Sequence, residues 1–105
     1  MLIVETPVFT RRVLKLLTDE NYRLLQRELV ADPEAGDLIR HSGGLRKIRW
    51  SVAGRGKRGG VRIIYYSAPA QATILMLLMY GKNEQDDLTR EQLRTLKRLV
   101  EEEFA

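Results

Sequence analysis

The sequence predicts an α+β fold in which the elements follow the order βααβββα within a single domain, residues 1–105. Three observations carry this prediction. Apolar residues recur with helical spacing in two consecutive segments near the N-terminus and in one segment at the C-terminus. Between these segments lie three stretches whose alternation, or whose β-branched and aromatic content, is typical of strands. The composition, 44% hydrophobic and 30% charged, is that of a folded domain with its own core.

The first predicted elements are a short strand and a helix. The apolar run at residues 2–4 ends before Pro7, which suits a strand. From residue 8 to residue 17, apolar side chains recur at the spacing of a helix face, at Phe9, Val13, Leu16 and Leu17.

A second helix follows directly. Thr18 or Asp19 is a suitable N-cap, and Asp32 followed by Pro33 ends the helix, because the residue before a proline is pushed out of the helical conformation. One face of this helix carries Tyr22, Leu25 and Leu29. Two helices joined by a tight turn form a hairpin that must cover an apolar surface.

The stretch 33–44 is predicted to be irregular, and Ser42-Gly43-Gly44 punctuates its end. It contains His41, the only histidine of the chain. A lone histidine in a polar loop is usually a surface residue, although any mechanism that depends on a histidine must use this one.

The stretch 45–52 alternates as a strand does, with Arg46, Ile48 and Trp50 on one face and Lys47 and Arg49 on the other. If Ile48 and Trp50 face the core, Lys47 and Arg49 are presented together on the open face.

A glycine-rich hairpin loop, GRGKRGG at residues 54–60, follows this strand and carries Arg55, Lys57 and Arg58. It is not a nucleotide-binding P-loop, because no Gly-Lys-Ser/Thr follows at the required spacing. We interpret the glycines as allowing a basic loop to lie close to a sugar–phosphate backbone.

Two further strands are predicted at 61–66 (VRIIYY) and at 73–80 (TILMLLMY), the second apolar on both faces and therefore central. In the first of them, alternation places Arg62 on the same face as Ile64 and Tyr66. A guanidinium among apolar neighbours needs an anionic partner. That partner is either a carboxylate in a structural salt bridge or a group supplied by a ligand.

The last element is a helix. Thr89 and Gln92 form a capping box before it, and Leu88 and Leu93 form a hydrophobic staple. Its apolar stripe consists of Leu93, Leu96, Val100 and Phe104.

Positive charge is concentrated between Arg40 and Arg62. This stretch holds eight of the 18 basic residues and no Asp or Glu, so it carries +8, whereas the other residues, ten basic and fourteen acidic, carry about −4. Such segregation is typical of a site for a polyanion. The alternative is a solvated, charged hairpin. The interleaving of the cations with strand-forming residues fixes them on a scaffold and favours a functional site.

Some kinds of site are excluded. The chain has no cysteine, which excludes disulfides and thiolate zinc sites. We expect neither a metal nor a cofactor, because the acids Glu84, Asp86 and Asp87 resemble a solvated lead-in to the last helix more than a magnesium site. The N-terminus lacks the features of a signal peptide, and the apolar run Ala72–Tyr80 is far shorter than the ~20 residues of a membrane helix. These features predict a cytoplasmic protein with no membrane contact.

Cutting RNA requires a deprotonated 2′-OH, a stabilised phosphorane and a protonated 5′-oxygen. The chain has no histidine pair for this task. Crowding among cations lowers the pKa of a lysine toward neutrality, and the rigid fork of donors on Arg62 can hold a pentavalent phosphate. Such a site depends on a second body to orient the RNA. The cations expected to attract an RNA backbone are Arg46, Arg55, Arg58 and Arg40.

Three blocks of the sequence, GGLRKIRW at 43–50, GKRGGVRIIYY at 56–66 and LLMYGKNEQDDLT at 77–89, resemble the RelE/HigB toxins of bacterial type II toxin–antitoxin pairs, most closely the HigB-like branch. The likeness covers nearly the whole chain in length and element order. It implies a small RelE-like fold, a compact sheet with helices packed against it. It also implies a ribosome-dependent endoribonuclease that cuts mRNA in the ribosomal A site without a metal and is silenced by a cognate antitoxin protein.

The same resemblance implies which residues do the chemistry. Members of the family cleave by attack of a ribose 2′-OH on the adjoining phosphate, using Lys, Arg and sometimes Tyr. By position the catalytic set is Arg62, Lys57, Lys82, Lys47 and Arg49. RelE-type relatives often carry an arginine just after the Gly-Lys pair and a tyrosine further on, where this chain has Asn83 and Thr89. Proton transfer then falls to a lysine or to the RNA that the ribosome positions.

Two other functions are open at this level. One is a non-catalytic toxin of the same superfamily, such as a ParE-like gyrase poison, which has no need of a convergent phosphate-handling set. The other is a plain RNA-binding module, which requires exposed aromatic side chains that stack on bases. Tyr66 and Tyr80 are the only candidates for stacking, and both fit a core position better.

Overall fold

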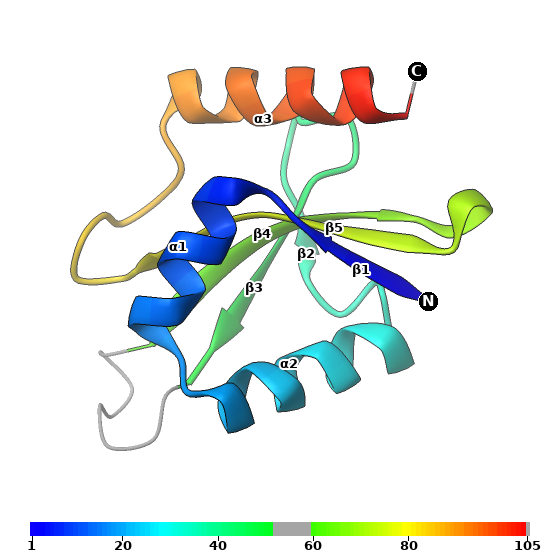
Figure 1. Cartoon of the computed structure of the whole chain (residues 1–105). Coiled ribbons are helices and arrows are strands. Elements are labelled where there is room, and N and C mark those ends of the chain that lie inside the picture. Colours follow the sequence, from blue (N-terminus) through cyan, green and yellow to red (C-terminus); the bar gives the residue numbers. More distant parts are fainter. Residues whose placement is uncertain (52–59, 105) are drawn as a thin grey trace.

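The computed structural model describes residues 1–51 and 60–104, which form a five-stranded sheet with helices on both of its faces (Figure 1). The strand order is β1-β5-β4-β3-β2. The elements are β1 (Leu2–Glu5), α1 (Pro7–Leu16), α2 (Asp19–Ala31), β2 (Asp37–Leu38), β3 (Arg46–Trp50), β4 (Val61–Ala68), a 3₁₀ turn (Pro69–Gln71), β5 (Thr73–Gly81) and α3 (Arg90–Glu103). The predicted α+β class and the antiparallel meander of β3, β4 and β5 are confirmed. No helix in this part of the chain is long and apolar enough to cross a membrane.

The sheet separates two apolar cores. The α1–α2 hairpin covers one face of the sheet, where Phe9, Leu25 and Leu29 are fully buried. The opposite face is covered by α3, which buries Leu96 and Val100 against β4 and β5. Both helical stripes therefore lie where the hydrophobic spacing predicts, and each holds its helix against one side of the sheet.

The helix boundaries follow from the capping residues. Thr18 caps α2 by accepting a hydrogen bond from the Asn21 N–H at 3.1 Å, and the helix ends at Asp32. Thr89 and Gln92 form the predicted capping box at the start of α3. These local signals confirm the sequence-based boundaries to within a residue or two.

The first strand pairs with the last one, in parallel, although 71 residues separate Leu2 from its partner Thr73. Thr6 secures this junction. Its hydroxyl accepts a hydrogen bond from the Phe9 N–H at 3.1 Å, which caps α1, and donates one to the Leu77 carbonyl at 2.8 Å. One side chain thus joins the start of α1 to the interior of β5.

The stretch 33–44, predicted to be irregular, contains the short strand β2, so the observed order has one strand more than predicted. In β2, Asp37 pairs with Lys47 and Leu38 pairs with Arg46. Two residues carry no alternation that a pattern could reveal. The strand exists because the chain returns alongside the edge of β3.

Alternation along the inner strands is confirmed. Ile48 and Trp50 contact the α1–α2 core, so Lys47 and Arg49 lie on the α3 face. In β4, Ile64 and Tyr66 pack in the α3 core, on the side predicted for Arg62. Val52, which ends the predicted strand 45–52, lies outside the described residues.

Candidate active site

Four cations predicted to be catalytic, Lys47, Arg49, Arg62 and Lys82, lie toward one end of the sheet. At this end β3 ends, β4 begins and β5 leads into the linker to α3 (Figure 1). Arg49, Arg62 and Tyr80 are Cα partners across these three strands. Residues paired directly across antiparallel strands project from the same face. The next row on that face is Lys47, Ile64 and Leu78. The sheet thereby brings together three predicted site residues from two strands, Lys47, Arg49 and Arg62, which we call the cationic row.

Arg62 is buried within this row. It is only 8% exposed, and the one hydrogen bond that its side chain makes within the described residues is a long one, from Nη1 to the Val61 carbonyl at 3.4 Å. Within the same residues it forms no ion pair, so the internal salt bridge considered from the sequence has no acidic partner there. A buried guanidinium without a carboxylate is costly unless an anion completes it. Arg62 therefore forms a candidate anion site.

Tyr80 lies beside Arg62 and is only 2% exposed. Its hydroxyl is buried and has no hydrogen-bond partner among the described residues. Burial raises the pKa of Tyr80 and the Asp87 carboxylate raises it further, whereas the charge of Arg62 lowers it, with a net rise. The phenol consequently stays protonated at neutral pH and presents a hydrogen-bond donor.

Lys47 is held by an acid from the linker. Its Nζ lies 3.1 Å from Asp87 Oδ1, which also accepts a hydrogen bond from the Leu88 N–H at 2.8 Å. That backbone hydrogen bond is the larger cause of the lowered pKa of Asp87, and the hydrogen bond from Lys47 is the second. The sequence predicts that Asp87 belongs to a solvated lead-in to the last helix and does not predict this contact. No local pattern could reveal it, because 40 residues separate the partners.

Lys82 follows β5 and is exposed at the same end of the sheet. Its backbone N–H donates to the Gly60 carbonyl at 3.2 Å, which extends the β4–β5 pairing by one step. Gly60 itself has no space for a side chain, because a Cβ there would lie 2.9 Å from the Trp50 carbonyl oxygen. The close approach of β3 and β4 at Gly60 fixes the backbone around Lys82 and Arg62.

A turn anchored by Glu84 holds Lys82 in place. Glu84 Oε1 accepts from the Gly81 N–H at 3.0 Å, and its other oxygen is paired with Arg12 of α1. Arg12 also donates from Nε to the Met79 carbonyl at 3.2 Å. The hydrogen bond from Arg12 and the one from the Gly81 backbone lower the pKa of Glu84. The turn is thus tied to both α1 and β5.

The structure does not bring Arg46 to the cationic row. Arg46 lies on the opposite face of β3, where Nη1 donates to the Gly36 carbonyl at 2.8 Å and to the Glu34 carbonyl at 3.3 Å. Its Nη2 lies 3.9 Å from a Glu34 carboxylate oxygen. Arg46 therefore fastens the segment before β2 to β3. Its predicted contact with RNA is still a prediction.

Arg40 and His41 are exposed in a turn before the start of β3, whereas Arg49 stands near its end. The neighbouring Gly43 approaches the side chain of Lys97 in α3. Arg40 and His41 are therefore not part of the cationic row. Three further candidates, Arg55, Lys57 and Arg58, lie outside the described residues.

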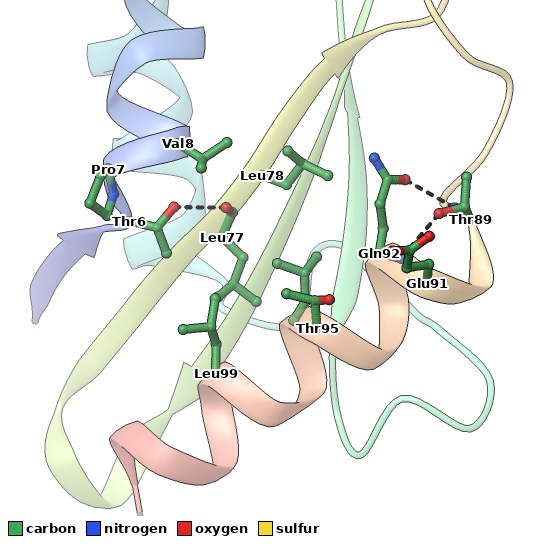
Figure 2. A pocket seen from close by; sticks show the side chains of 11 residues that line it. Thr6, Pro7, Val8, Leu77, Leu78, Thr89, Glu91, Gln92, Thr95 and Leu99 are labelled. Atoms are coloured by element: carbon green, nitrogen blue, oxygen red, sulfur yellow. Dashed lines mark hydrogen bonds between the residues drawn. The ribbon is translucent and has the colours of Figure 1, made fainter.

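An apolar groove of about 630 Å³ lies between the start of α1, β5 and the first half of α3 (Figure 2). Its walls include Val8, Leu78 and Leu99, and none of the described residues that line it is a lysine or an arginine. Among residues 1–51 and 60–104 there is also no group of three side chains suited to hold a metal ion. The groove and the cationic row are thus chemically distinct places on the molecule.

No protein-family model matches the chain. Solved structures of the E. coli toxin RelE do match. A double arginine-to-alanine mutant in the free state gives a TM-score of 0.61 at 12% identity, over 94% of this chain and 95% of that one. The isolated E. coli RelE toxin gives a TM-score of 0.56 at 15% identity, over 93% of this chain and 97% of that one. The protein therefore has the fold of the RelE toxin.

Proposed function

We propose that this protein is the toxin of a type II toxin–antitoxin pair, a ribosome-dependent endoribonuclease that cuts mRNA in the A site. Support comes from the RelE toxin fold, from the three sequence blocks typical of the HigB-like branch, and from the cationic row. The observation that carries the proposal is Arg62, a buried guanidinium that has no carboxylate partner among the described residues. A rigidly placed donor of this kind suits transition-state stabilisation better than mere attraction of substrate.

In the proposed reaction the ribose 2′-oxygen attacks the adjoining phosphorus. The 2′-O–P bond forms and the P–O5′ bond breaks, which leaves a cyclic phosphate and a 5′-hydroxyl. The 2′-OH proton passes to a base and the 5′-oxygen receives a proton. Arg62 donates to the phosphorane, while Arg49 and Lys82 add positive charge at the same end of the sheet. No metal or cofactor takes part.

Lys47 and Lys57 complete the proposed catalytic set. Lys47 reaches the substrate only when Asp87 releases it, because the two side chains are paired at 3.1 Å. Lys57 is assigned from its place in the sequence block at 56–66 alone. In this proposal the general base is either one of these lysines or a group of the RNA that the ribosome orients.

The proposed partners are the ribosome, its mRNA and a cognate antitoxin that suppresses toxicity, all in the cytoplasm. Expression of the chain alone in a bacterial cell is expected to stop growth, and co-expression of the antitoxin to restore it. Harmless expression of a correctly folded chain would contradict the proposal.

Arg62→Ala tests the assignment. We expect mRNA cleavage, measured by primer extension on ribosome-bound message, to fall by about two or more orders of magnitude, as for the loss of a key transition-state donor. Ribosome binding should persist, because seven other cations of the 40–62 stretch are retained. The control is Arg23→Ala on the exposed surface of α2, which should cleave normally.

The melting temperature of the same Arg62→Ala preparation distinguishes a catalytic role of Arg62 from a purely structural one. If Arg62 served only to stabilise the fold, its loss would lower the melting temperature and would change cleavage only in proportion to the unfolded fraction. Normal cleavage by a stably folded variant would remove Arg62 from the active site.

A further inference from the structure

A second buried polar group stands beside Arg62 with no described partner: the hydroxyl of Tyr80. Its ring belongs to the α3 core, where Ile64, Leu77 and Leu96 surround that part of the sheet. Hydrophobic packing explains why the ring is buried but not why the hydroxyl is buried. A buried O–H group without a hydrogen bond destabilises a fold, so its presence calls for an explanation.

Tyr65 shows how this chain treats a buried phenol that serves the fold. Its hydroxyl donates to the Pro33 carbonyl at 2.8 Å and accepts from the Gly36 N–H at 2.9 Å. Both hydrogen-bonding capacities of that oxygen are used. Tyr80, one strand away and on the opposite face of the sheet, has neither contact within the described residues.

The charges near Tyr80 restrict which kind of group could be the hydrogen-bond partner of its hydroxyl. Arg62 offers only donors, and the protonated phenol offers another donor. Asp87 is an acceptor in the vicinity, but its hydrogen bonds among the described residues come from Lys47 and from the Leu88 N–H, and neither of its oxygens accepts from the Tyr80 hydroxyl. One oxygen that accepts from both Arg62 and Tyr80 must carry several lone pairs and negative charge. A non-bridging oxygen of a phosphodiester has these properties.

We propose that Tyr80 is a further catalytic residue, whose hydroxyl donates a hydrogen bond to a non-bridging oxygen of the scissile phosphate held by Arg62. The inference rests on the proposed function and deepens it. In this role Tyr80 is a donor to the developing charge and moves no proton. Tyr80 does not occupy the position at which RelE-type relatives often carry a tyrosine, because that position is Thr89 in this chain.

Tyr80→Phe is the direct test, because it keeps the ring and removes only the hydroxyl. Two quantities are measured on the full-length protein. The first is the shift in melting temperature when chloride is replaced by inorganic phosphate at equal ionic strength. The second is the cleavage rate on ribosomes saturated with the protein. We expect an unchanged or higher melting temperature in chloride, a smaller phosphate shift, and cleavage slower by about 100-fold.

Tyr65→Phe is the matched control. It leaves the Gly36 N–H without its acceptor, so it should lower the melting temperature in chloride while keeping the full phosphate shift. A Tyr80→Phe protein with the wild-type phosphate shift and cleavage rate would overturn the inference. A drop in melting temperature like that of Tyr65→Phe, with an unchanged phosphate shift, would overturn it as well.

The two proposals fail in different ways. If the wild-type protein does not cut ribosome-bound mRNA, and Tyr80→Phe still reduces the phosphate shift, the anion site stands and the ribonuclease function falls. If the wild-type protein cuts mRNA and Tyr80→Phe cuts it equally well, the function stands and the role of Tyr80 falls.

Discussion

At the scale of single residues, two arginines of one strand illustrate how position decides the role of a charge. Arg49 is exposed beside Arg62, whereas Arg46 lies on the other face of β3 and donates to two backbone carbonyls. An exposed cation near a phosphate contributes attraction that water screens. A cation that donates to backbone carbonyls and so holds a segment against the sheet contributes to the stability of the fold.

The two alanine variants should therefore behave oppositely. Arg46→Ala is expected to lower the free energy of unfolding by about 2 kcal/mol, because the Gly36 and Glu34 carbonyls lose a charged donor. Its cleavage rate should change little. Arg49→Ala is expected to keep its stability and to cut mRNA about tenfold more slowly. Urea unfolding measures the stability of both variants, and primer extension measures their cleavage rates. Equal effects of the two changes on stability and on cleavage would contradict the prediction.

The sequence could predict which face each of these residues occupies, because alternation along β3 needs only local pattern. It could not predict their contacts. The acceptors of Arg46 come from the segment that folds back as β2, and the acid that holds Lys47 comes from the linker before α3. Both contacts depend on the tertiary arrangement, which no window of the sequence contains.

At the scale of elements, the turn between β5 and the linker is anchored by one side chain, that of Glu84. Glu84 joins Gly81 of β5 to Arg12 of α1. A Cβ at Gly81 would lie 2.6 Å from the side-chain oxygen of Asn83, so a larger residue there would require the Asn83 side chain to turn away. The anchor holds the backbone that carries Lys82, so α1 contributes to the placement of a residue that follows β5 and is far from α1 in the sequence.

This anchor predicts acid sensitivity. The pKa of Glu84 is lowered from its ordinary value of 4.5 by the hydrogen bonds from Arg12 and Gly81, so the folded state favours the ionised form. Its contribution to stability is present above about pH 4.5 and is lost as the pH falls through the lowered pKa. Glu84→Gln should thus show a shallower fall in melting temperature between pH 6 and pH 3 than the wild type.

Because both side chains are partly exposed and screened by solvent, Glu84→Gln should lose only about 0.5 kcal/mol of stability at neutral pH. Glu102→Gln, at an exposed position near the end of α3, serves as the control and should follow the wild-type pH profile. A Glu84→Gln profile identical to that of the wild type would show that the anchor contributes nothing.

Elements with strong local signals were predictable, and those created by pairing were not. The three helices follow from spacing, and the ends of α2 and the start of α3 follow from Thr18, Asp32 and Thr89, whereas Thr6, which caps α1, was not predicted. The parallel pairing of β1 with β5, the strand β2 and the extra residue Leu77 between the pairs Ile64–Leu78 and Tyr65–Met76 follow from how distant strands meet. Such events leave no periodicity in the sequence.

At the scale of the whole molecule, fold and charge divide the protein into two functional parts. The α1–α2 layer closes one side of the sheet with an apolar core, and the cationic row occupies the end of the other side. The cations that the structure describes at this end of the sheet therefore belong to a scaffold that is stabilised elsewhere. The exposed ones, Arg49 and Lys82, can be changed singly with little effect on folding, which makes their role in binding measurable, whereas Arg46 on the opposite face contributes to stability.

The salt dependence of ribosome binding tests that role. Binding that neutralises RNA phosphates releases counterions, so the logarithm of the affinity falls linearly with the logarithm of the salt concentration. We expect Arg55→Gln and Arg58→Gln each to weaken binding modestly and to flatten this slope by about one counterion. The same loss of charge on the exposed surface of α2, in Arg23→Gln, should leave the slope unchanged.

This comparison separates a local site from the general charge of the protein, because Arg55→Gln and Arg23→Gln lower the net charge of +4 by the same amount. If net charge alone drove binding, both changes would alter the slope equally. If the 40–62 stretch contacts RNA, only the change within it alters the slope, because only there is a phosphate's counterion released. Equal slopes for both variants and the wild type, measured by sedimentation with ribosomes from 50 to about 200 mM salt, would make these arginines bystanders. The attraction of RNA would then rest on the cationic row alone.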